Sequence, residues 1–370
     1  YYMSESFFNP AAAYSPAVES ERAVNAARAR LAGAMNAVAD EIVFTSGGTE
    51  SNNMAIYGSL GAMRGQGRLV VSAVEHPSVY EVMKRLSPEY DVVEAGVDQQ
   101  GRVDVAGLAQ LVTPGTRFVS VMQVNNETGA INDIPAIYKL VKREAPGALL
   151  HVDGVQGFLK VPFEARNCDF YTVSGHKFHG PKGVGMLYAR RGIILTNLIE
   201  GGAQERGKRG GTENVPGIAA MAAALTEACA NMDENTKKVT ALRDKLIDGI
   251  SKIPHCALNG AREPRLPGNV NFCFEGIEGE SLLLLLDAKG ISASSGSACT
   301  SGSLDPSHVL LAIGRPHEVA HGSLRLTICE DNTEEEIDYI LAELPPIVDD
   351  LRNMSPVWKD LMSGKRQFTL

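Results

Sequence analysis

The sequence lacks several features that would each point to a particular class of protein. It has no run of lysine or arginine and no stripe of basic and aromatic residues, and its formal net charge is −9. Nucleic acid and anionic membrane surfaces are therefore unfavourable partners. Apolar stretches such as 282–286 are far too short to span a bilayer, and no secretory signal opens the chain at Tyr1.

The cysteines lack the spacing of a metal site. None of them forms a CxxC pair, so we expect no zinc or cluster held by this chain alone. A chain of 370 residues needs no disulfide scaffold, which favours reduced thiols in the cytoplasm. The six cysteines lie at positions 168, 229, 256, 273, 299 and 329.

Length and composition indicate a two-domain globular protein. Hydrophobic residues make up 44% of the chain and charged residues 21%, as in soluble proteins with a sizeable core. A chain of 370 residues exceeds one ordinary domain. We expect a large domain over 1–245 and a smaller one over 246–370.

The first part of the chain alternates between strand-like and helix-like patterns, which predicts an α/β fold with a mostly parallel sheet. The predicted strands are 41–45, 68–73, 117–124, 148–152, 169–173 and 184–189. Helical patterns fall at 49–60 and 77–86, followed by 215–231 and 235–251. After Pro254 the pattern becomes α+β, with strands predicted at 268–275 and 322–327 and helices at 280–289 and 333–352.

Asp153 and Lys177 follow two neighbouring predicted strands. An acid at one strand end and a lysine at the next is the geometry that a pyridoxal phosphate enzyme needs, because the acid pairs with the pyridinium nitrogen and the lysine forms a Schiff base. Lys182 lies further from the strand end, so we assign the role to Lys177. A lysine in a glycine- and histidine-rich loop is also typical of a solvated surface residue.

Other polar residues follow strands at the edge where ligands bind in open α/β sheets. Gly48 and Thr49 open a helix, whose N-terminus favours a phosphate, although the same turn is typical of a plain helix cap. His76 could stack on a planar cofactor or be structural. Asn126 could bind a phenolic oxygen or a carboxylate, or belong to a polar turn. Arg325 is a lone positive charge in an apolar predicted strand, which suits it to bind a carboxylate.

The segment 292–303 contains neither a charge nor a bulky side chain, and it carries Cys299. Such a composition predicts flexibility. A single cysteine on a flexible tether indicates a nucleophile that travels. The alternative is a serine- and glycine-rich linker with an incidental thiol. We expect the part from 294 to 303 to be poorly ordered.

Together these motifs resemble the cysteine desulfurases of the class V aminotransferase fold, which is the fold type I of pyridoxal phosphate enzymes. The resemblance covers essentially the whole chain and is most specific at SGHKFHGPKGVG (174–185), HVDGVQ (151–156), GGTESNN (47–53) and SSGSACTSGSLDPSHVL (294–310). The last stretch is similar to the group with a long cysteine loop, which serves iron–sulfur cluster assembly and nitrogenase maturation. Family members usually begin with a strand that borders the substrate site, and this sequence begins after it.

The resemblance implies a role for each candidate residue. Lys177, Cys299 and His76 are the implied catalytic residues. Cys299 becomes a persulfide, and His76 stacks on the ring and shuttles protons. Asn126 and Arg325 are the implied ligands of the substrate carboxylate. The implied ligands of pyridoxal 5'-phosphate are Gly48, Thr49, His76, Asp153, Gln156, Ser174, His176, Lys177 and Thr212.

The implied activity is conversion of L-cysteine to L-alanine, with the sulfur passed to an acceptor or cluster scaffold protein. Thr212 matches a threonine that reaches the phosphate of the neighbouring subunit, which implies a homodimer. The rival activities are a selenocysteine lyase or another β-elimination on the same cofactor. A scaffold without enzyme activity is a further alternative, against which Lys177, Asp153 and Cys299 all argue. We expect no membrane association, no nucleic acid binding and no metal.

Overall fold

The computed structural model describes residues 1–296 and 305–370, which form two compact units. The first unit comprises Tyr1–Ala95, Val103–Val124 and Asn132–Met232. The second comprises Gly96–Arg102, Asn125–Ile131 and Asp233–Leu370. The domain boundary predicted between 245 and 246 falls inside helix α6 (Val215–Ile250), whose first part belongs to the first unit and whose last part belongs to the second.

The first unit is built on a mixed sheet with the strand order β1-β7-β6-β5-β4-β2-β3. Strands β2 to β6 pair in parallel, while β7 is antiparallel to both β6 and β1. The mostly parallel sheet predicted from the sequence is therefore confirmed. The strands are β1 (Ile42–Thr45), β2 (Arg68–Ser72), β3 (Asp91–Ala95), β4 (Thr116–Ser120), β5 (Leu149–Asp153), β6 (Phe170–Ser174) and β7 (Gly185–Ala189).

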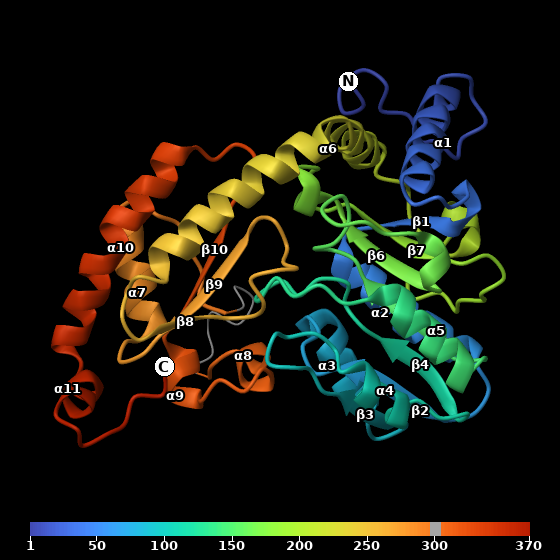
Figure 1. The fold of residues 1–370 in the computed structure, drawn as a ribbon. Coiled ribbons are helices and arrows are strands. Elements are labelled where there is room, and N and C mark those ends of the chain that lie inside the picture. The colour runs from blue at the N-terminus through green and yellow to red at the C-terminus, as the bar shows by residue number, and fades with distance from the viewer. Residues whose placement is uncertain (297–304) are drawn as a thin grey trace. The chain divides into compact units, whose positions relative to one another are not determined.

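Helices pack beside this sheet (Figure 1). They are α1 (Ala17–Ala34), α2 (Gly48–Ala62), α3 (Pro77–Leu86), α4 (Val105–Leu111) and α5 (Ile134–Glu144). Pro77 at the first position of α3 and Pro135 at the second position of α5 help fix where these helices begin. Each helix is preceded by a capping side chain, from His76 and Asp133. Apolar side chains of α2 and α3 bury a shared core against the strands, with Met54, Ile56 and Phe118 almost fully covered.

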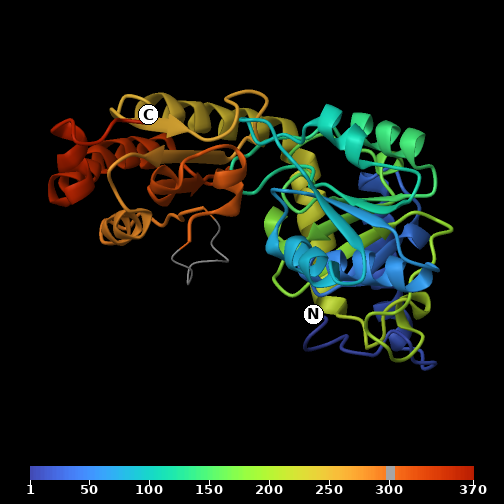
Figure 2. The same ribbon diagram turned by 90° about the horizontal axis from the view of Figure 1, so that it is seen from below.

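The second unit contains an antiparallel sheet of order β10-β9-β8 (Figures 1 and 2). Its strands are β8 (Cys256–Leu258), β9 (Asn269–Phe274) and β10 (Ser323–Thr327). Its helices are α7 (Gly279–Asp287), α8 (His308–Ala312), α9 (His317–His321), α10 (Glu334–Met354) and α11 (Pro356–Met362). Apolar residues of α6, α7 and α10 form one core with the sheet, in which Phe272, Leu282 and Leu344 are buried.

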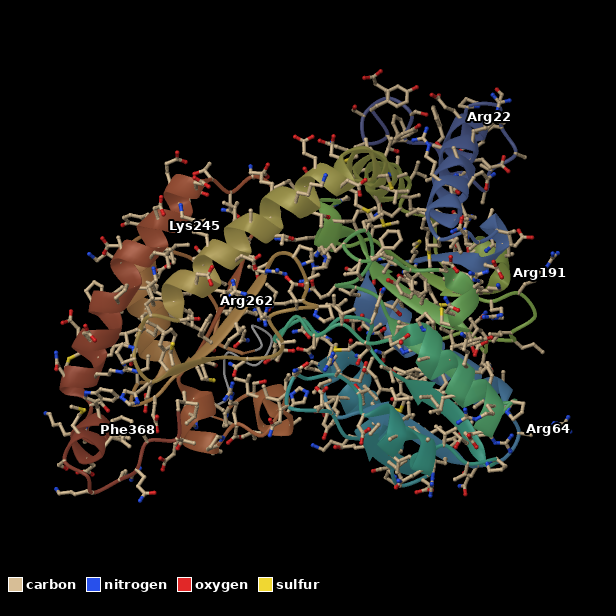
Figure 3. The ribbon with its side chains drawn as sticks, in the orientation of Figure 1. Arg22, Arg64, Arg191, Lys245, Arg262 and Phe368 are labelled. Carbon is tan, nitrogen blue, oxygen red and sulfur yellow. The ribbon has the colours of Figure 1, made fainter. Side chains whose placement is uncertain are left out.

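An ion pair and an aromatic stack connect elements of the second unit at its surface. Lys245 on α6 faces α10 in Figure 3, and its Nζ lies 2.7 Å from Asp338 Oδ1. Phe368, also labelled in Figure 3, stacks on the ring of His255 with a centroid separation of 3.8 Å. These contacts hold α10 and the last described residues against the body of the unit.

In the described part of the chain, α6 is the helix that is long and apolar enough to cross a membrane by length and composition. The core helix of a soluble protein meets the same test. Ile218 and Leu225 are buried in the part that belongs to the first unit, and Leu242 and Leu246 in the part that belongs to the second. Both parts of this helix thus contain buried residues, and 33% of its 18-residue apolar window is buried.

Candidate active site

Asp153 and Lys177 lie at the carboxyl ends of adjacent parallel strands. Asp153 is the last residue of β5 and is opposite Thr172 of β6 in the ladder. β6 ends at Ser174, and a single 3₁₀ turn over Gly175–Phe178 then presents Lys177, which is half-buried. Lys182, the rival candidate, is exposed and lies beyond that turn. The adjacency expected from the sequence is therefore present in the fold.

The Asp153 carboxylate is buried and receives two hydrogen bonds. Asn52 Nδ2 donates to Oδ2 at 2.8 Å, and the backbone N–H of Val155 donates to Oδ1 at 3.0 Å. Asn52 lies in α2 and is 1% exposed. Within residues 1–296 and 305–370, its Oδ1 atom has no hydrogen-bond partner, so an acceptor remains available beside the acid.

His76 precedes α3 and is joined to Asn52 through Ser78. Asn52 Nδ2 also donates to Ser78 Oγ at 2.8 Å, and Ser78 Oγ lies 2.8 Å from His76 Nδ1. The backbone N–H of Ser78 donates to the same nitrogen at 3.1 Å. A continuous set of hydrogen bonds thus runs from Asp153 to the His76 ring. Asn52 and Ser78 were not singled out from the sequence, because only the fold shows that α2 and α3 meet here.

Gly48 begins α2 in a space that cannot hold a side chain. A Cβ atom at this position would lie 2.9 Å from Val155 Cγ2. Gly47 has a φ angle of 152°, a conformation that favours glycine. The exposed Thr49 follows in the first turn, so the start of this helix offers a hydroxyl and backbone N–H groups to an anion.

Ser174 and His176 face each other at the end of β6, with Ser174 Oγ 3.0 Å from His176 Nδ1. Burial lowers the pKa of His176, and the positive charges of Lys177 and Lys182 lower it further. A histidine among cations indicates a locally positive field. Such a field suits a phosphate group.

Gln156 and Thr212 are the remaining predicted cofactor ligands of the first unit. Gln156 is half-buried in the turn after β5, and Lys160 Nζ lies 3.3 Å from its Oε1 atom. Thr212 is exposed after a loop that Arg209 ties to α2, with Arg209 Nε 2.9 Å from Glu50 Oε1. The first unit thus brings Gln156 to the Asp153 strand end, whereas Thr212 lies on its surface.

Asn126 and Arg325 are brought together within the second unit. Arg325 Nη1 donates to the backbone oxygen of Asn126 at 3.2 Å. The guanidinium therefore contacts the main chain of Asn126. The main chain of Arg325 in turn pairs with Ser294 as an isolated antiparallel bridge. Cys299 lies outside the described residues, as does most of the segment 294–303 that we expect to be poorly ordered.

Glu127, next to Asn126 in the second unit, is a buried acid that the sequence analysis did not single out. Its Oε2 atom accepts a hydrogen bond from Ser307 Oγ, and a Cβ atom added to Gly296 would lie 3.0 Å from it. Burial raises the pKa of Glu127, while the hydrogen bond from Ser307 and the charges of His308 and Arg325 oppose that rise. Its place next to Asn126 in the sequence was the available signal.

Glu75 is a second buried acid that was missed, this time in the first unit. Its Oε1 atom accepts from Ser72 Oγ at 2.7 Å and from the backbone N–H of Met122. Burial raises the pKa of Glu75 to about 8, and the nearby charge of Asp153 adds to the rise. The sequence signal was its position immediately before His76.

Comparison with known proteins places the chain in a family. Residues 1–340 match the family described as Aminotransferase class-V. A protein named cysteine desulfurase IscS from Clostridium botulinum is 46% identical over 373 residues, covering 99% of this chain and 94% of that protein. A cysteine desulfurase IscS from Methanosarcina thermophila is 46% identical over 360 residues, covering 96% and 89%.

Solved structures give the same result. A NifS-like protein superposes with a TM-score of 0.89 at 35% identity, covering 95% of this chain and 94% of that one. DndA from Streptomyces lividans superposes with a TM-score of 0.76 at 34% identity, covering 88% and 93%. The chain therefore belongs to the class-V aminotransferase family, in its cysteine desulfurase group, as the sequence motifs suggested. The fold is that of the fold type I enzymes, whose cofactor is pyridoxal phosphate.

The residues of the first unit fit this cofactor. Asp153 supplies a fixed carboxylate for a protonated ring nitrogen. The space at Gly48 and the positive field around His176 suit a phosphate group, and Asn52 Oδ1 is a buried acceptor. The donor set thus matches both the ring and the phosphate of the cofactor.

Proposed function

We propose that this chain takes the sulfur from L-cysteine, releases L-alanine and holds the sulfur as a persulfide on Cys299. The observation that carries the proposal is the pair of Asp153 and Lys177 at the ends of adjacent parallel strands, with Ser174 and His176 beside them. The names of the relatives, cysteine desulfurases, agree with it.

The proposed ligands of the cofactor come from the first unit. Asp153 holds the ring nitrogen, Gln156 faces the phenolic oxygen and His76 stacks on the ring. Gly48, Thr49, Ser174 and His176 hold the phosphate, with Thr212 of a second copy of the chain. When bound, pyridoxal phosphate supplies an electron sink for the carbon that loses its proton.

Two of the catalytic residues, Lys177 and Cys299, then have defined tasks. Lys177 in its neutral form removes the α-proton of cysteine and later delivers a proton to the carbon that loses sulfur. The thiolate of Cys299 attacks the sulfur of the substrate, so that one S–S bond forms as the C–S bond breaks. The products are alanine and one persulfide, which balances atoms and electrons without an added oxidant.

The proposed ligands of the substrate carboxylate come from the second unit. Arg325 offers a planar pair of donors, which suits a carboxylate better than a lysine would. Asn126 lies against it and adds a side-chain amide. A cysteine thus bound is oriented by its carboxylate and not by its sulfur, which leaves the sulfur open to Cys299.

A direct assay tests the activity. Purified protein loaded with pyridoxal phosphate is mixed with L-cysteine, alanine is quantified, and mass spectrometry locates added sulfur. We expect alanine with one extra sulfur on Cys299. Sulfide released without sulfur on Cys299 would point to a β-elimination, and faster turnover of L-selenocysteine to a selenocysteine lyase. If no product forms, the result would favour a scaffold without enzyme activity.

We further propose a cytoplasmic homodimer that shares its sites and passes sulfur to an acceptor or cluster scaffold protein, without membrane or nucleic acid. Thr212 is exposed, as a residue reaching a second copy must be. Mixing inactive Lys177→Ala subunits with impaired Thr212→Ala subunits should restore activity, because one site per mixed dimer is then intact. Mixtures no more active than their parts would contradict shared sites. Radiolabelled sulfur traced from the loaded enzyme would identify the acceptor.

A further inference from the structure

The hydrogen bonds between Asp153 and His76 have a defined direction. We propose that Asn52 and Ser78 are positioning residues that connect the Asp153 carboxylate to the His76 ring and fix that ring with its hydrogen on Nε2. The proposal deepens the function above, since it rests on cofactor and substrate binding beside Asp153 and His76. Four side chains on β5, α2 and the start of α3 carry it, all within the first unit.

The orientation of the Asn52 amide is set by its partners. Nδ2 lies 2.8 Å from both Asp153 Oδ2 and Ser78 Oγ. A flipped amide would place its oxygen against the Asp153 carboxylate, and two acceptors at that distance repel each other. Both hydrogens of the amide are therefore used, one toward Asp153 and one toward Ser78.

The orientation of the Ser78 hydroxyl follows from that of Asn52. A serine hydroxyl has one hydrogen to donate, and its oxygen accepts the hydrogen bond from Asn52. Its neighbour on the other side is His76 Nδ1, at 2.8 Å. The hydroxyl hydrogen therefore points to Nδ1, and that nitrogen acts as an acceptor.

The start of α3 reinforces this assignment. His76 is the N-cap residue of the helix, and Pro77 has no N–H to offer. The N–H of Ser78 comes next and donates to Nδ1 at 3.1 Å. A hydrogen placed on Nδ1 would face two donors at once. The neutral imidazole consequently carries its hydrogen on Nε2.

The fixed tautomer defines what His76 does for a bound molecule. At Nε2 the neutral ring offers an N–H group and no lone pair. His76 is thus a hydrogen-bond donor toward an electron-rich atom, such as a phenolate oxygen or a developing thiolate, and does not take a proton at Nε2. Proton removal from the substrate is left to Lys177.

Solid-state ¹⁵N NMR of protein labelled at histidine tests the tautomer directly. The spectrum of the His76→Gln variant, subtracted from that of the loaded enzyme, isolates the ring. We expect a protonated Nε2 and an unprotonated Nδ1. In Ser78→Ala, where only the backbone N–H still donates to Nδ1, we expect a fraction of the rings to carry the hydrogen on Nδ1. In Ser78→Thr, which keeps the hydroxyl, we expect the original signal. Ser59→Ala, a buried serine of α2 outside this network, should change nothing.

Asn52→Ala supplies the second measurement. Loss of its bond to Asp153 should weaken retention of pyridoxal phosphate by about tenfold or more, measured by dialysis, because hydrogen bonds to charged groups are the stronger ones. It should also shift the His76 tautomer through Ser78. An unchanged His76 signal in both Ser78→Ala and Asn52→Ala would overturn the proposal. The NMR result does not require turnover, so it stands apart from failure of the desulfurase assay.

Discussion

Asp153 and Glu127 are buried carboxylates, one in each unit, and their partners differ in kind. Asp153 receives N–H groups from the Asn52 amide in α2 and from the main chain of Val155 in the turn after β5. Glu127 receives the hydroxyl of Ser307 and lies against Gly296. These two residues flank the segment 297–304 that carries Cys299.

The difference lies in what the two carboxylates hold in place. Donors on neighbouring elements hold Asp153 at the end of its strand, which suits a ring bound in one orientation. Glu127 contacts both Gly296 and Ser307, so these two residues, which flank 297–304, lie close to each other. The first arrangement fixes a carboxylate at a strand end, and the second joins Gly296 and Ser307.

The largest effect is expected from removing Lys177 in the first unit. Lys177→Ala should abolish alanine formation, and borohydride reduction should no longer fix the cofactor to the chain. Lys182→Ala is the matched control, because this exposed lysine lies a few residues further on. Peptide mass spectrometry after reduction checks both variants. An adduct on Lys182 in the unchanged protein would refute the assignment of Lys177.

The next largest effect is expected from removing the thiol of Cys299. Cys299→Ala should lower alanine production at least 100-fold while cofactor binding and the absorbance change on adding L-cysteine persist, because the ring site lies among residues of the first unit. Cys229→Ala, which alters an exposed thiol on α6, serves as the control. Full turnover by Cys299→Ala would instead support simple elimination.

Glu75 allows a test of the fixed site through pH. Its pKa of about 8 lies above its ordinary value of 4.5, so the folded protein holds a proton that the unfolded chain releases. The free energy of unfolding should therefore fall as pH rises from about 4.5 to 8, by roughly 2–4 kcal/mol. Glu75→Gln should remove this dependence in cofactor-free protein, measured by urea unfolding at several pH values. Equal pH profiles for both proteins would count against a neutral Glu75.

A smaller effect is expected at Gly296, which tests its contacts with Ser307 and Glu127. A Cβ atom there would lie 2.7 Å from Ser307 Cβ, so Gly296→Ala should destabilise the protein by about 1–3 kcal/mol and slow persulfide formation. Gly96→Ala is the control, because nothing lies within 4 Å of its added Cβ. Urea unfolding and persulfide labelling measure the two effects. Equal stability of the two variants would show that the flanks are not held together.

The same contacts change the expected meaning of a proline at Gly296. From composition, Gly296→Pro stiffens a flexible segment. In the fold, the N–H of Gly296 donates to Ser323 Oγ at 3.2 Å, and its Cα has no room for a substituent. Proline would remove that hydrogen bond and press on Ser307 as well.

Local patterns predicted much of the fold. Most strands of the first unit were placed within a residue or two, and the helix predicted at 77–86 is α3. Strand β3 (Asp91–Ala95) was missed because its pattern is irregular, with exposed Asp91 and Glu94 on either side of two half-buried valines. Strand β8 (Cys256–Leu258) is too short to show one. The helices expected at 215–231 and 235–251 are one helix, because the polar residues between them do not break it.

The candidate site likewise contains residues that the sequence predicted and residues that it did not. Asp153, Lys177 and Ser174 were predictable because each follows a strand, and strand ends meet at one edge of a parallel sheet. Asn52 and Glu127 depend on contacts between distant parts of the chain, 101 residues apart for Asn52 and Asp153 and 180 for Glu127 and Ser307. No pattern of neighbouring residues encodes such pairs.

The discontinuous second unit has a consequence for the order of folding. Asn269 and Asn271 on β9 donate to the backbone oxygen of Glu127 from 142 and 144 residues further along the chain. Residues 125–131 therefore emerge from the ribosome long before their partners, and closing loops of this length slows folding. A nascent chain must complete the sheet of the first unit around a segment destined for the second. The second unit is thus completed only after β9, which holds residue Glu127, has been synthesised.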